Sequence, residues 1–141
     1  MKLKTGEVTK HMEFKTGLPR ECPPIHAKSV NIHPVYRFTT TNVPSESDFL
    51  NHVEKKNPYP PQKKCEAMAL SFFTTREAAD ELQRSIKRFK KMSISEGRIN
   101  QSAGVCTINK KQHLNLWLFK DVTAHKMVNI FNGKESGNDA K

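Results

Sequence analysis

A run of basic side chains near the middle of the 141-residue sequence is the feature with the most direct chemical meaning. Five cations fall within eight residues, on a stretch whose apolar residues recur at steps of three and four, as on one face of a helix. One or two cations complement a helix C-terminus, so the excess favours phosphate contacts, with a solvated helix face as the alternative. Two lysines in a predicted turn extend the cluster. The candidate nucleic-acid contacts are Arg84, Lys87, Arg88, Lys90, Lys91, Lys110 and Lys111.

The overall charge points to the same class of partner. The chain has 24 Lys+Arg against 14 Asp+Glu, a formal net charge of +10. An excess of this size attracts polyanions through counterion release. The sequence therefore predicts a partner that is either nucleic acid, held through its phosphate backbone, or an acidic protein surface.

Residue spacing does not support a metal site or a common nucleotide loop. The six histidines are far apart and form no i, i+4 pair, and the three cysteines form no C-x-x-C. The chain has no G-x-x-x-x-G-K-[ST], G-x-G-x-x-G or G-x-S-x-G motif. We therefore predict no metal ligand and, on the main hypothesis, no cofactor.

A second set of residues is defined by order along the chain. Arg37 lies in Val-Tyr-Arg-Phe-Thr-Thr, and Ser71 lies in Ala-Leu-Ser-Phe-Phe-Thr-Thr, just before a predicted helix. A later strand reads Ser-Ile-Ser-Glu-Gly-Arg-Ile. This order resembles ADP-ribosyltransferase-like domains of the Arg–Ser–Glu type.

The resemblance implies an NAD-dependent transferase or an NAD-cleaving enzyme. Arg37 would hold the dinucleotide phosphates, and Ser71 would order the ribose pocket. The last predicted strand has no glutamate, so Glu96 is the nearest candidate for the catalytic carboxylate. His113 titrates near neutral pH and is the candidate general acid or base.

The elements that must position these residues are predicted from hydrophobic periodicity and cap signals. Helices are expected from Ser45 to about residue 56, over 75–91 and over 123–131. Strands are expected at 35–39, 65–73, from 92 onward, at 105–108 and at 113–119. The predicted fold is a small two-layer α+β domain, strand-helix-strand-helix followed by an antiparallel three-strand meander.

The chain divides into three predicted parts. Residues 1–30 are rich in glycine, proline and basic residues and predict a basic extended arm. Residues 31–131 form a single α+β domain, and residues 132–141 are expected to be a disordered tail.

The cysteines indicate a reducing compartment. Cys22, Cys65 and Cys106 are odd in number and widely spaced, which predicts free thiols and a cytoplasmic protein. No stretch approaches the roughly 20 apolar residues that span a bilayer, so no membrane partner is expected.

Three functional hypotheses follow from the sequence. The leading one is a non-enzymatic, basic, intracellular protein that binds nucleic acid or an acidic partner. The second is the ADP-ribosyltransferase-like enzyme. The third is a subunit of a larger assembly that meets its partner through apolar surface at Trp117 or 123–131. Whether the protein is an enzyme stays open at this stage.

Overall fold

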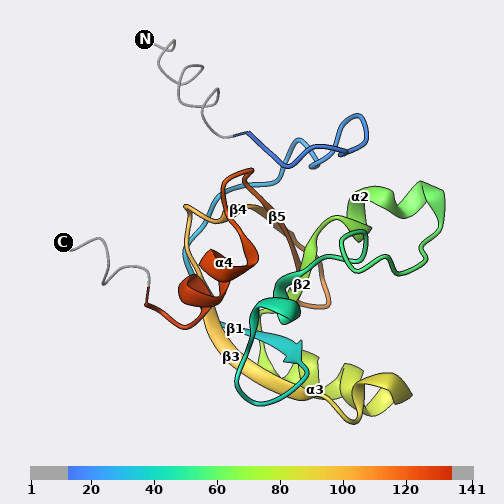
Figure 1. Cartoon of the computed structure of the whole chain (residues 1–141). Helices are drawn as coiled ribbons and strands as arrows, with labels where there is room; N and C mark the ends of the chain where they lie inside the picture. Colours follow the sequence, from blue (N-terminus) through green and yellow to red (C-terminus); the bar gives the residue numbers. More distant parts are fainter. Residues whose placement is uncertain (1–12, 135–141) are drawn as a thin grey trace.

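One antiparallel five-stranded sheet organises the protein, so the predicted mixed α+β class is confirmed (Figure 1). The computed structural model describes residues 13–134; residues 1–12 of the predicted arm and 135–141 of the predicted tail lie outside that range. The strands are β1 (Ile32–Thr39), β2 (Leu70–Phe73), β3 (Ser93–Ile99), β4 (Gly104–Ile108) and β5 (His113–Leu118), in the spatial order β3-β1-β2-β5-β4.

Helices and several short helical turns accompany the sheet. Within residues 13–134, the helices of eight or more residues are α3 (Arg76–Ser85) and α4 (Ala124–Phe131). Short elements are α2 (Lys64–Ala67) and the 3-10 turns η1 (Glu46–Phe49), η2 (Pro61–Lys63) and η3 (Lys87–Phe89). None of the helices within residues 13–134 is long and apolar enough to cross a bilayer.

The core lies between one face of the sheet and α4. The Thr123 hydroxyl caps α4 by accepting the Lys126 N–H at 3.0 Å, so the helix predicted over 123–131 begins at Ala124. Phe131 then packs on Phe49 of η1 and Phe72 of β2, with ring centroids 5.4 and 6.1 Å apart. The remaining core positions follow the period of two along the strands and include Val35, Leu70, Ile99, Leu114 and Leu116.

The opposite face of the sheet is only partly covered. Ser71 pairs with Asn115, and Phe73 pairs with His113, so these four side chains share the face away from α4. Helix α3 packs against β1 and β2, at the end of the molecule away from the N-terminal segment (Figure 1). The uncovered part of this face is where a ligand has access to the sheet.

The predicted three-strand meander is wrong. β3 pairs with β1 along Thr39 to Ile32, while β4 and β5 form the other side of the sheet. Only residues 100–103 join β3 to β4, although these strands lie at opposite edges. Five residue steps span at most about 18 Å, which is too short for a flat sheet of this width. The sheet is therefore curled, so that its two edge strands approach each other at this end. Local order along the chain did not show which edge β3 would join.

The helix predicted over 75–91 ends early, at Ser85. Thr75 caps its start, accepting the Ala78 N–H at 3.1 Å. Phe89 stacks on Phe38 of β1 at 4.4 Å, and Gln83 donates to the backbone carbonyl of Phe89 at 3.0 Å. These contacts hold the chain in the η3 turn against the sheet, which a continuing helix could not reach.

Two other predicted elements are also shorter than expected. The strand predicted at 65–73 begins at Leu70, because the chain first turns through α2, where the Cys65 carbonyl accepts the Trp117 indole N–H at 2.9 Å. The helix predicted from Ser45 to about 56 is only the η1 turn. Asn51 interrupts it, since its side chain accepts the Glu54 N–H and donates to the Met68 carbonyl instead.

The prediction of three free thiols is corrected by a disulfide between Cys22 and Cys65. The described part of the arm crosses β4 and β5, with bridges from Phe14 to Phe119 and from Lys28 to Cys106. This path brings Cys22 beside α2, a proximity that a spacing of 43 residues does not reveal. Cys106 is free and buried, and burial raises the pKa of its thiol. Two of the three cysteines therefore no longer support a reducing compartment.

Candidate functional site

A cleft opens on the uncovered face, where β1 and β2 separate. These strands pair at Tyr36 and Phe73, and beyond that pair the Arg37 side chain fills the gap. Its Nη1 donates to the Ser71 carbonyl at 2.6 Å, and its Nε and Nη2 donate to the Asp48 carbonyl at 2.8 and 2.6 Å. The Arg37 guanidinium thus satisfies the Ser71 carbonyl, which a longer hydrogen-bond ladder between β1 and β2 would otherwise have paired. The two strands therefore lie apart at this point.

The cleft consists of three overlapping hollows that all include His113 in their lining. The hollow between β1, β2 and η3 has a volume of about 400 Å³, and its neighbour toward the 58–60 loop has about 490 Å³. Four residues line both of these hollows: His52, Ser71, Arg88 and His113. We call the combined hollow the central cleft.

Aromatic rings form the floor of the central cleft. Phe89 stacks on Phe38 at 4.4 Å, Phe38 meets Phe73 edge to face at 5.9 Å, and Phe73 lies 5.3 Å from the His113 ring. The row runs from η3 across β1 and β2 to β5. Phe38 and Phe89 are half-buried and line the cleft, so they can contact a flat, apolar group such as a nucleobase.

Cations predominate around this floor. Among the described residues, the lining of the three hollows contains two carboxylates, Glu66 and Glu81. Glu66 is partly neutralised by an exposed ion pair with Lys63, at 3.6 Å. The lining cations outnumber the carboxylates, so the cleft favours anions; they are Arg37, Lys55, Lys63, Arg88 and Lys111.

Two imidazoles in the cleft have lowered basicity. Burial lowers the pKa of His113 below its ordinary value of 6.5, and the charge of Glu66 opposes this shift. Burial also lowers the pKa of His52, and the charges of Lys55, Arg88 and Arg37 act in the same direction. The Asn57 amide donates to His52 Nδ1 at 3.1 Å and orients the ring. Both rings are therefore largely neutral at pH 7.

Arg37 lies at the edge of the cleft but is committed to the fold. It is 8% exposed, and its guanidinium lies 5.3 Å from each of the rings of Phe49 and Phe72. Burial lowers the pKa of Arg37 to about 10, with the charge of Asp48 opposing the shift. The group therefore remains charged at neutral pH. Three of its N–H donors are held by backbone carbonyls, which limits what it can offer a ligand.

The structure brings some of the predicted site residues together and leaves others apart. Arg37, Ser71, His113 and Arg88 all line the 400 Å³ hollow, and Lys111 joins His113 in the hollow beside α3. Arg88 also covers the Phe89 ring, 4.6 Å from its centroid. The other predicted cations are exposed, and none lines the three hollows of the described chain; they are Arg84, Lys87, Lys90, Lys91 and Lys110.

His52 and Asn57 line the cleft but were not predicted from the sequence. Both lie between η1 and η2, in the stretch expected to be a helix that ends at a proline loop. Their only signal was the density of polar and basic residues before Pro58. Glu96, by contrast, is exposed on β3 opposite Tyr36, and it lines none of the three hollows of the described residues.

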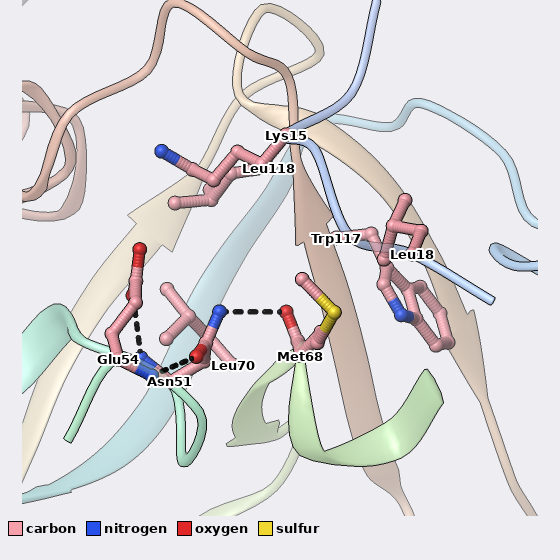
Figure 2. A pocket seen from close by; sticks show the side chains of 8 residues that line it. All are labelled: Lys15, Leu18, Asn51, Glu54, Met68, Leu70, Trp117 and Leu118. Carbon is pink, nitrogen blue, oxygen red and sulfur yellow. Dashed lines mark hydrogen bonds between the residues drawn. The ribbon is translucent and has the colours of Figure 1, made fainter. Parts of the chain in front are cut away.

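The apolar surface expected at Trp117 or 123–131 is largely buried. Trp117 is 2% exposed, and α4 places Met127, Ile130 and Phe131 in the core. A tight cavity does lie where the arm residues Lys15 and Leu18 cross β5 (Figure 2). Its volume of about 10 Å³ holds roughly one water molecule, so it is a packing gap rather than a ligand site.

Comparisons with known proteins found no relative of this chain. Within residues 13–134, no group of three or more His, Cys, Asp or Glu side chains is placed to hold a metal ion. No protein-family model, curated protein or solved structure matches the chain, so the argument for function depends on the geometry of the central cleft.

Proposed function

We propose that the protein binds single-stranded nucleic acid in the central cleft. The observation that carries this proposal is that Arg88 and Lys111, from η3 and the β4–β5 turn, both lie beside a continuous aromatic floor. Cations contact the phosphate backbone, while bases stack on the rings. Bases paired inside a duplex are not free to stack on this floor, so single strands should be preferred.

The outer cations support the same function by extending the positive surface. Arg84, Lys87, Lys90 and Lys91 lie on α3, η3 and the residues that follow, next to Arg88 in the chain. At this distance from the cleft they would attract a polyanion and increase its rate of association. The protein would recognise the strand through attraction to its phosphates and stacking on its bases, without hydrogen bonds to the base edges.

Fluorescence anisotropy with a labelled single-stranded oligonucleotide tests the proposal. We expect binding that weakens steeply with salt, and weaker binding to the matching duplex. The Arg88→Gln/Lys111→Gln protein should lose about 1.4 from the salt slope and bind about 25-fold more weakly near 0.1 M salt. The matched control, Arg20→Gln/Lys134→Gln, removes the same charge outside the three hollows and should bind nearly as well as wild type. Equal losses in both proteins would contradict a cleft-specific contact.

A dinucleotide in the same cleft is the second candidate function. The observation that favours it is that Arg37 and Ser71 lie in contact and line one hollow, as the resemblance to ADP-ribosyltransferase-like domains requires. Nearby Glu66, which lines the next hollow with Ser71, would take the carboxylate's role in place of Glu96. Release of nicotinamide from NAD, lost in Glu66→Gln, is the expected result on this hypothesis. An NAD solution that neither binds nor reacts would exclude it.

A further inference from the structure

Two histidines and an arginine meet in the central cleft. His52 comes from the segment after η1, His113 from the start of β5 and Arg88 from η3. All three line both the 400 Å³ hollow and its 490 Å³ neighbour, so they border the same space in the cleft. The influence of Arg88 on the titration of His52 also places this pair close together.

We propose that the cleft cleaves the RNA it binds, with His52 and His113 as the proton acceptor and proton donor and Arg88 at the phosphate. This inference rests on the proposed function, because it needs a nucleic acid in the cleft. Two imidazoles and a cation can supply the base, the acid and the charge stabilisation that internal cleavage of RNA uses.

The reaction is a transfer of the phosphate to the neighbouring 2′-oxygen. One imidazole removes the proton of the 2′-hydroxyl as that oxygen forms a bond to phosphorus. The bond from phosphorus to the 5′-oxygen breaks, and the other imidazole gives a proton to this leaving oxygen. The products are a 2′,3′-cyclic phosphate and a 5′-hydroxyl, and no further reactant is consumed. Arg88 stabilises the charge on the non-bridging oxygens in the transition state.

The charges around the two rings set the pH dependence. His52 faces Lys55, Arg88 and Arg37, and its basicity is low. His113 faces the opposing charge of Glu66, and Lys111 and Glu81 border the hollow on its other side. Since one ring must be neutral and the other protonated, cleavage should follow a bell-shaped pH profile, with its maximum below about pH 6.5 and a decline at both lower and higher pH.

The test measures cleavage and binding separately. Cleavage is followed with a labelled single-stranded RNA in EDTA, and products are identified by mass. Binding is measured with the same sequence in 2′-deoxy form, which lacks the attacking hydroxyl. Wild-type protein should cleave the RNA, leave a 2′,3′-cyclic phosphate and bind the 2′-deoxy strand without cutting it.

Single substitutions assign the activity to the cleft. His52→Gln and His113→Gln should each lower the cleavage rate by at least about 100-fold, a much larger loss than any change in the affinity of the same variant for the 2′-deoxy strand. The control His125→Gln alters an exposed histidine that pairs with Glu46 at 3.0 Å, outside the three hollows, and should leave both measurements unchanged. His52 is exposed, so His52→Gln keeps the test valid even if His113→Gln fails to fold.

The outcomes separate the two proposals. Binding without cleavage overturns this inference and leaves the proposed function intact, whereas absence of binding removes the proposed function itself. Cleavage that persists in both variants, or that also cuts the 2′-deoxy strand, overturns the assignment to His52 and His113.

Discussion

Replacing Arg37 by methionine should destabilise the fold rather than simply weaken a ligand site. Methionine keeps most of the apolar stem but removes the group that holds the Asp48 and Ser71 carbonyls. Three hydrogen bonds from a charged donor are lost, each with a net contribution of about 2 kcal/mol. The two carbonyls then remain without their present donor in a buried setting.

The loss is partly offset because the buried charge itself is costly. Burial lowers the pKa of Arg37 to about 10 although the charge of Asp48 opposes the shift, which corresponds to a net penalty of roughly 3 kcal/mol on the charged form in the folded state. Methionine avoids that cost. The expected net loss in the free energy of unfolding for Arg37→Met is therefore about 3 kcal/mol, or a fall of about 10 °C in the melting temperature.

Urea unfolding followed by circular dichroism measures this change. The control is Arg84→Met, which removes an exposed arginine from the last turn of α3 and should change stability by less than about 0.5 kcal/mol. If Arg37→Met is as stable as wild type but loses ligand binding, our reasoning is refuted. Arg37 would then act on a ligand, as the NAD hypothesis requires.

Three further predictions concern stability. Gly97→Ala places a Cβ against the backbone oxygen of Phe131 and should cost at least about 2 kcal/mol in urea unfolding; an unchanged midpoint would show that α4 moves easily. Reducing the disulfide between Cys22 and Cys65, which closes a loop of 43 residues, should lower stability by up to about 4 kcal/mol, and no shift with dithiothreitol would contradict this. For Asp48, burial raises the pKa, but hydrogen bonds from Ser45 and Thr40 outweigh it and hold the pKa below 3.8. Its contribution is therefore present above about pH 4 and lost as the pH falls further, and Asp48→Asn should flatten this acid limb of the stability curve.

The sequence predicted the elements whose signals are local. The alternation of Leu114 and Leu116 with His113 and Asn115 gave both the strand and the faces of its side chains. The helix predicted over 123–131 likewise agrees with α4, which runs from Ala124 to Phe131. In these places the local period and the tertiary environment agree, so pattern alone was sufficient.

The features that were missed depend on contacts between distant segments. Stacking of Phe89 on Phe38 ends α3 early, and pairing of β3 with β1 replaces the meander. The disulfide depends on the path of the arm. The central cleft is of the same kind, because His52 reaches His113 only through the turns between η1 and η2. The clustering of basic residues predicted that Arg88 and Lys111 bind a ligand. It could not show which of the clustered cations border a cleft.

The most direct test of a nucleic-acid site in the central cleft is a titration of the ¹⁵N-labelled protein with a short single-stranded DNA, followed by amide chemical shifts. We predict the largest shifts in η3, in the turn from Asn109 to His113 and in the segment from His52 to Lys63, with α4 unchanged. Shifts centred on α4 or on the arm at 13–30, or no shifts at low salt, would contradict the account.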